Sequence, residues 1–323
     1  MPPLVSIIIP CYNNESFVGE AIASAIAQDY NPIEIIVIDD GSSDRSIEMI
    51  KDFGDRIYWE TGENLGAPKA RNRGIELARG EYIKFLDADD VLLPTCLSRQ
   101  VALAEQIDAA SKAITYGDAI WVDLHGQTIP SSPLRPRQKD EDAIAHILAH
   151  SPLTSCPLHK REYLLAISGF DPSLPRGQEY DLHLRLVLSG VEFRYDPHPV
   201  YKYREYISDR RISQKPYSIK GAMFQFQTLQ RHWQLIETQT NKPLQPQVRA
   251  ILARRFWIFG RSILREGYIN EARDYFDAAQ SLDSKNFMAG NTIYILLVKV
   301  LGFYRTEILI TKFKSLLKLI SQS

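Results

Sequence analysis

Apolar residues in the first third of the chain form short continuous runs, separated by turn residues and by stretches with helical spacing. Residues 5–9 and 33–38 are runs rich in β-branched side chains, which is typical of parallel strands buried on both faces of a sheet. Between those runs, apolar positions recur at helical spacing over 18–26. A further strand is expected over 81–86, after a helix that begins near Pro68. This alternation predicts an α/β domain with a mostly parallel central sheet covered by helices.

The periodicity changes in the last third of the chain. Before that point we expect strands over 113–118 and 120–124, a helix over 179–189 and short strands over 191–203. From residue 217 onward the pattern is helical, with prolines between the helices. We therefore predict an α/β domain over 1–216 and a C-terminal helical region over 217–323. Within that region, residues 260–286 resemble one tetratricopeptide unit, which is either a packed helical hairpin or a protein-binding surface.

Composition argues against several classes of protein. The 323 residues carry a net charge of -1, so the chain lacks the overall positive charge on which nonspecific nucleic-acid binding relies. Cys11, Cys96 and Cys156 are few and widely spaced, which argues against a disulfide framework or a zinc site and favours a reducing, cytoplasmic setting. The first residues lack a signal-peptide pattern. Neither a dinucleotide-binding GxGxxG sequence nor a P-loop is present.

Acidic residues gather at the ends of two predicted strands. Asp39 and Asp40 close one buried run, and Asp87, Asp89 and Asp90 close another. The carboxyl ends of parallel strands meet at one edge of a sheet, where open α/β sheets bind their ligands. Carboxylate oxygens suit Mg²⁺ or Mn²⁺, above all a cation that substrate phosphates also hold. The alternative interpretation is a solvated acidic turn at each strand end.

Four segments together carry a family resemblance. They are VSIIIPCYN at 5–13, IDDGSSD at 38–44, NLGAPKARN at 64–72 and GEYIKFLDADD at 80–90. In this order and spacing they resemble the inverting glycosyltransferases of family 2, and the resemblance extends over about 5–216. It implies the GT-A fold, a nucleotide-diphosphate sugar as donor, with uridine diphosphate as the expected nucleotide, and Mn²⁺ or Mg²⁺ as cofactor.

The resemblance also implies roles for individual donor-site residues. Pro10 and Tyr12 match the loop that lines the nucleoside pocket, and Asp40 matches the acid that hydrogen-bonds the base. Asp87 and Asp89 match the DxD motif of the family. In that motif Asp89 is the direct metal ligand, and Asp87 reaches the ribose or the waters of the metal.

Three arginines are further donor-site candidates. Arg71 stands where the family often has arginine, and it either braces the carboxylates or phosphates or lies on a solvated helix face. Arg210 and Arg211 belong to a basic stretch that either closes over the diphosphate or forms an exposed turn.

The segment RGQEYDLHLR at 176–185 resembles the second motif of the family, in which an acidic pair opens a helix beneath the acceptor. This alignment places Glu179 at the position of the general base, with Asp181 as the substitute candidate. The segment departs from the family pattern, because Gln178 replaces an acid and Glu179 replaces an aspartate. The alternative is that both acids only stabilise the first turn of a helix through its dipole.

The resulting prediction is transfer of a hexosyl or hexosaminyl group to a glycan or lipid-linked acceptor, in the assembly of surface polysaccharide of the cell envelope. A catalytically silent sugar-nucleotide or protein-binding module on the same scaffold is the alternative. Residues 285–323 carry six basic residues and one acidic residue among apolar ones. This pattern predicts either a peripheral contact with the inner face of the cell membrane or a terminal helix packed on the domain.

Overall fold

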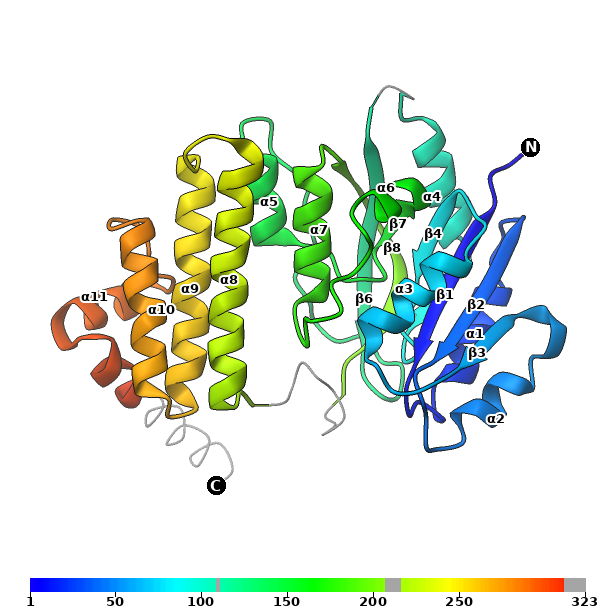
Figure 1. The fold of residues 1–323 in the computed structure, drawn as a ribbon, viewed down its shortest axis with the longest axis horizontal. Coiled ribbons are helices and arrows are strands. Elements are labelled where there is room, and N and C mark those ends of the chain that lie inside the picture. The colour runs from blue at the N-terminus through cyan, green and yellow to red at the C-terminus, as the bar shows by residue number, and fades with distance from the viewer. Residues whose placement is uncertain (109–110, 207–215, 311–323) are drawn as a thin grey trace. The chain divides into compact units, whose positions relative to one another are not determined.

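The computed structural model describes residues 1–108, 111–206 and 216–310 and divides the chain into two compact units (Figure 1). The first unit comprises Met1–Gln214 and the second comprises Lys215–Ser323. The first is a sheet covered by helices, and the second is helical.

An eight-stranded mixed sheet forms the centre of the first unit. Its strands are β1 (Val5–Cys11), β2 (Ile33–Asp39), β3 (Tyr58–Thr61), β4 (Tyr82–Phe85), β5 (Val91–Leu92), β6 (Ala113–Val122), β7 (Pro157–Lys160) and β8 (Glu192–Arg204). They follow the order β3-β2-β1-β4-β7-β6-β8-β5. All pairs among β3, β2, β1 and β4 are parallel, as is the pair of β6 and β8, whereas β7 is antiparallel to both its neighbours.

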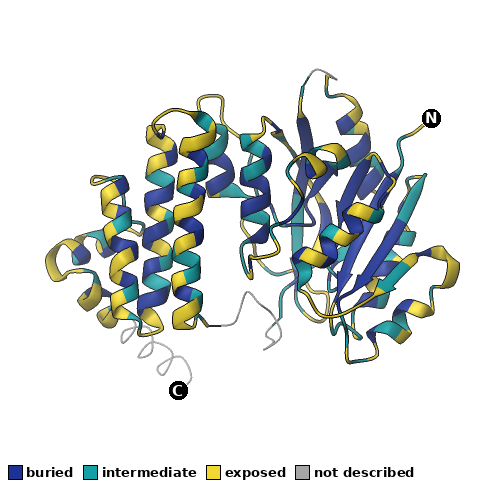
Figure 2. Cartoon of the chain, viewed as in Figure 1, coloured by how far each residue is buried: buried dark blue, intermediate teal, exposed yellow. Residues whose placement is uncertain are grey.

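Side chains of β1 alternate between two apolar layers on opposite faces of the sheet. Ile7 and Ile9 are buried with the apolar residues of α1 (Val18–Ile26), whereas Ile8 is buried with residues of α3 (Ala67–Leu77). A Cβ atom on Gly74 of α3 would lie 2.3 Å from Cγ2 of Ile8, so helix and strand are in close contact. Covering on both faces explains the almost continuous apolar run of β1. Figure 2 shows the strands of this region as buried.

The other helices of the first unit are α2 (Ser46–Lys51), η1 (Gly54–Arg56), α4 (Cys96–Glu105), α5 (Ala143–His150), α6 (Arg161–Ala166) and α7 (Gln178–Leu188). The prediction of two separate strands over 113–118 and 120–124, and of short strands over 191–203, was wrong, because β6 and β8 are each continuous. The two strands shift register on either side of Asp118. A Cβ atom on the neighbouring Gly117 would lie 2.4 Å from the carbonyl oxygen of His198. A bulge therefore keeps the strands paired where the sequence indicated a break.

Helices α8 (Ile219–Thr240), α9 (Pro246–Arg265), α10 (Ile269–Leu282) and α11 (Thr292–Leu301) belong to the second unit, and so do the helical residues 303–310. α9 and α10 form a hairpin over most of the repeat-like stretch, and a Cβ atom on Gly260 of α9 would lie 2.9 Å from that of Tyr275. The Tyr275 hydroxyl donates to the carbonyl oxygen of Ala222 in α8 at 2.6 Å. Within the described ranges, no helix combines the length and the apolar character that a membrane crossing requires.

Candidate active site

The carboxyl ends of β1, β2 and β4 lie at one edge of the sheet, with β1 in the middle. Cys11 at the end of β1 pairs with Asp39 of β2, and Ile8 pairs with Phe85 of β4. Asp40 follows β2 directly, and the Asp87 turn follows β4. The structure thus brings the two acidic clusters to the same edge, on opposite sides of β1.

Asp40 is a buried carboxylate held by the start of α3. The backbone N–H groups of Leu65 and Gly66 donate to its two oxygens at 2.8 and 2.9 Å. Burial raises the pKa of Asp40, and these two hydrogen bonds oppose the shift. Gly66 has a φ of 92°, a backbone conformation that favours glycine, where the chain turns into α3.

Hydrogen bonds join the loops that follow β1 and β2. Pro10 is buried at the end of β1, whereas the side chain of Tyr12 is exposed. Between the loops, the Asn13 N–H donates to Ser42 Oγ at 2.9 Å, and Asn13 Oδ1 accepts from the Ser43 N–H at 2.8 Å. Tyr12 therefore stands on a fixed loop next to the end of β2.

Arg71 of α3 connects the acidic turn after β4 to the start of α7. Its side chain is 8% exposed. Nη2 donates to Asp87 Oδ1 at 2.6 Å, and Nη1 donates to Gln178 Oε1 at 2.8 Å. The guanidinium also lies over the ring of Phe170, 5.3 Å from its centroid. Arg71 is therefore not on a solvated helix face, and it braces the Asp87 carboxylate.

The end of β8 contacts the rest of the acidic turn. Tyr206 donates its hydroxyl to Asp89 Oδ2 at 3.2 Å. Arg204 donates from Nη1 to the carbonyl oxygen of Asp89 and from its backbone N–H to Asp90 Oδ1, each at 2.9 Å. Its Nη2 also pairs with Glu20 of α1 at 2.7 Å. Asp90 is buried in these contacts, whereas Asp89 is half-buried.

Sequence reasoning missed Arg204 and Tyr206. Both stand at the start of the basic stretch that contains Arg210 and Arg211, and those two arginines lie outside the described residues. The position of Arg204 in the sequence could have identified it, because an arginine at the end of a strand can reach the loops at that edge of the sheet.

The first turn of α7 carries the candidate bases. The helix begins at Gln178, after Gly177 in a left-handed conformation with a φ of 65°. Glu179 is half-buried, whereas Asp181 is 2% exposed and accepts from Arg185 Nε at 2.8 Å. The hydrogen bond from Arg71 to Gln178 ties this turn, and with it Glu179, to the Asp87 region. Asp181 is instead engaged within its own helix.

The acidic turn fits a divalent cation that takes few ligands from the protein. The side chain of Asp87 is 33% exposed and Asp89 is half-buried, so a cation can approach both carboxylates. In the part of the chain that the structure describes, no group of three or more histidine, cysteine or acidic side chains is arranged to hold a metal by itself. Mg²⁺ characteristically completes its coordination with water and substrate phosphates, so two carboxylates suffice.

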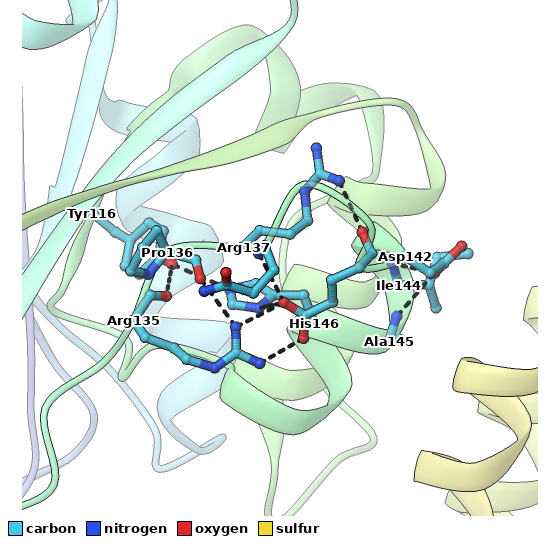
Figure 3. A network of polar contacts seen from close by, with 10 residues as sticks. Tyr116, Arg135, Pro136, Arg137, Asp142, Ile144, Ala145 and His146 are labelled. Atoms are coloured by element: carbon cyan, nitrogen blue, oxygen red, sulfur yellow. Dashed lines mark hydrogen bonds and ion pairs between the residues drawn. The ribbon is translucent and has the colours of Figure 1, made fainter.

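A second polar network holds the segment that precedes α5 (Figure 3). The Glu141 carboxylate accepts from both terminal nitrogens of Arg135 at 2.7 Å and lies 3.1 Å from Nδ1 of His146. Tyr116 of β6 donates its hydroxyl to the carbonyl oxygen of Arg135 at 3.2 Å. Asp142 caps α5 by accepting from two backbone N–H groups of its first turn. This network fastens a charged surface segment to both β6 and α5.

Comparison with known proteins bears on the class of this domain. Residues 6–164 match the family model described as Glycosyl transferase family 2. An uncharacterised glycosyltransferase of Rickettsia typhi (strain ATCC VR-144 / Wilmington) is 34% identical over 197 residues, which make up 60% of this chain and 62% of that protein. The chain therefore spans about three fifths of the length of this relative.

Two solved structures are similar in fold. The complex of S. aureus TarS 1-349 with UDP-GlcNAc superposes with a TM-score of 0.66 at 19% identity, over 94% of this chain and 87% of that one. The mannosyltransferase PcManGT from Pyrobaculum calidifontis, in complex with GDP-Man and Mn²⁺, gives 0.52 at 16% identity, over 98% and 88%. The sheet order and its helical layers define a domain of the GT-A class, as the motifs predicted. The domain that contains residues 6–164 matches glycosyl transferase family 2.

Proposed function

We propose that this chain is an inverting, cation-dependent glycosyltransferase that moves a sugar from a uridine-diphosphate donor onto an acceptor hydroxyl. The observation that carries the proposal is the shared sheet edge, with Asp40 on one side of β1 and Asp87 and Asp89 on the other. TarS was solved with UDP-GlcNAc, which supports the donor class. PcManGT was solved with Mn²⁺, which supports the cation.

The donor nucleotide would lie along this edge. The exposed ring of Tyr12 and the backbone after Pro10 would line the nucleoside, and Asp40 would accept a hydrogen bond from the base. Asp89 would hold the cation directly, and Asp87 would contact the ribose or the waters of the cation. When bound, the cation stabilises the negative charge that develops on the leaving diphosphate. Arg71 orients the Asp87 carboxylate through its hydrogen bond.

Glu179 is the general base of the proposed reaction. It takes the proton of the acceptor hydroxyl while that oxygen attacks the anomeric carbon on the face opposite the diphosphate. The bond from the anomeric carbon to the acceptor forms as its bond to the diphosphate breaks, so the configuration inverts. Glu179 is half-buried whereas Asp181 is 2% exposed, and this difference in accessibility supports Glu179 over Asp181 for this role.

The acceptor would be a glycan or a lipid-linked sugar in surface polysaccharide assembly, and the transferred group a hexose or hexosamine. In this proposal residues 1–216 form the transferase domain and residues 217–323 an accessory helical region. Arg210 and Arg211 stay candidates for contacts with the diphosphate.

A screen of nucleotide sugars tests the proposal. Each donor is incubated with the purified chain and Mn²⁺ or Mg²⁺, and the released nucleoside diphosphate is measured. We expect cation-dependent turnover of at least one donor, reduced roughly 100-fold or more by Asp89→Ala. Asp55→Ala, which changes an exposed aspartate of η1, is the matched control and is expected to keep the wild-type rate.

Two results would contradict parts of the proposal. Wild-type turnover by Asp89→Ala would refute the role of Asp89 at the cation. Donor binding without turnover of any donor, in the presence of a panel of acceptors, would favour the catalytically silent module.

A further inference from the structure

An apolar surface runs along the last helices that the structure describes in the second unit. In α11 the residues Ile293, Leu296 and Val300 are 71%, 61% and 72% exposed. Their spacing of i, i+3 and i+7 places them along one face of the helix. Tyr294 and Val298 are buried, so α11 packs on its unit through the opposite face.

Exposed residues also occur beyond Gly302, in the helical residues 303–310 (Figure 2). There too, large apolar side chains are exposed, while Thr306 and Glu307 are buried. Exposed apolar side chains that line one face of a helix, as in α11, mark a surface that binds a protein or a membrane. The C-terminal apolar face, as we define it, consists of Ile293, Leu296, Val300, Tyr304, Ile308 and Leu309.

Charge distinguishes between the partners that this face could bind. Lys299 and Arg305 are exposed beside it. Glu307, the acidic residue of this stretch, is buried and pairs with Arg261 and Arg265 of α9. Within residues 291–310, the exposed charge is therefore positive. A second copy of the chain would bring like charges together, whereas an anionic lipid surface would attract them.

We propose that the C-terminal apolar face docks onto the surface of an anionic lipid bilayer, with α11 lying in the plane of the interface. The aliphatic side chains would enter the boundary between headgroups and acyl chains, and Lys299 and Arg305 would extend to the anionic headgroups. Residues 311–323 add three lysines and no acidic residue to the sequence, which strengthens the attraction. This inference does not depend on the donor chemistry proposed above.

Co-sedimentation of the full chain with lipid vesicles tests the inference. One set of vesicles contains phosphatidylglycerol and phosphatidylcholine in equal parts, and the other contains phosphatidylcholine alone. We expect the chain to sediment with the anionic vesicles, and less so as salt is added. The triple substitution Ile293→Ser, Leu296→Ser and Val300→Ser is expected to weaken this partition at least about tenfold.

Two further variants separate the apolar and the electrostatic contributions. Lys299→Glu combined with Arg305→Glu should weaken sedimentation with anionic vesicles. Met223→Ser combined with Ile258→Ser changes exposed apolar residues of α8 and α9, and it should leave sedimentation unchanged. Circular dichroism checks that every variant is folded.

Three results would overturn the inference. The first is a wild-type chain that stays in the supernatant with both kinds of vesicle, and the second is a triple variant that sediments as the wild type does. The third is a dimer in light scattering that the triple substitution converts to a monomer, without vesicle binding by either protein.

Discussion

Arg71 and Gln178 are joined by a buried hydrogen bond of 2.8 Å, although they lie 107 positions apart in the sequence. The same guanidinium donates to Asp87 at 2.6 Å. One side chain therefore sets the spacing between the acidic turn after β4 and the first turn of α7. Because Gln178 directly precedes Glu179, the position of the proposed base relative to the proposed cation site depends on this link.

Replacing Arg71 with leucine should lower both stability and donor affinity. The substitution leaves Asp87 and Gln178 without their shared donor, which is expected to cost about 1–3 kcal/mol of unfolding free energy. Urea denaturation and donor titration measure the two effects. Arg73→Leu is the matched control on the same helix, because Arg73 is 47% exposed and its pairs with Glu60 and Glu76 are worth about 1 kcal/mol or less. Equal losses of unfolding free energy in Arg71→Leu and Arg73→Leu would show that Arg71 contributes no more than a surface residue.

Glu179→Gln and Asp181→Asn should have different effects if Glu179 is the base. Glu179→Gln is expected to preserve donor binding and the melting temperature but to lower transfer by roughly 100-fold or more, because the acceptor proton loses its base. Asp181→Asn should mainly lower the melting temperature, because it weakens the buried pair with Arg185. Calorimetric donor titration, transfer rates and thermal unfolding distinguish them. A larger loss of transfer in a fully folded Asp181→Asn variant would reverse the assignment.

Two glycine substitutions should have opposite effects on stability. One lies at the contact between α3 and β1, and the other lies at an open position of α1. Gly74→Ala should destabilise the chain by about 1–3 kcal/mol, because the new methyl group would overlap Ile8. Gly19→Ala in α1 should stabilise it by about 0.5–1 kcal/mol, since nothing lies within 4 Å of the added Cβ and alanine favours helix. Chemical denaturation measures both. A neutral Gly74→Ala variant would mean that α3 does not approach β1 as described.

Stability is expected to fall as the pH is lowered from about 6.5 towards 2. Hydrogen bonds from Arg135 lower the pKa of Glu141 to about 2 from an ordinary 4.5, so the unfolded chain protonates first and this contribution is lost as the pH falls between those values. Burial lowers the pKa of His146 from an ordinary 6.5, so protonation of the unfolded chain also costs stability below that pH. Melting temperatures across this range test the prediction.

Glu141→Gln isolates the contribution of the carboxylate. Its melting temperature should depend less steeply on pH than that of the wild type between pH 4.5 and 2. Glu105→Gln, at an exposed position of α4, should keep the wild-type slope. Parallel curves for Glu141→Gln and the wild type would show that the network in Figure 3 does not carry this dependence.

Local patterns in the sequence by themselves determine much of this protein. The β-branched runs of β1 and β2 and the family motifs each lie within about ten neighbouring residues, so they can be interpreted without knowing what packs against them. Parallel pairing then requires the carboxylates after β2 and β4 to meet at one edge. The continuous β6 was not predictable in this way, because the sequence alone does not distinguish a bulge within one strand from a break between two strands.

Only the tertiary structure decided which residues far apart along the chain are in contact. The link from Arg71 to Gln178, the approach of Arg204 and Tyr206 to the acidic turn, and the face of α11 that stays exposed all depend on how whole elements pack. A sequence specifies which side chains are apolar or charged through local chemistry. Which of them become partners follows from the burial and chain geometry of the complete fold.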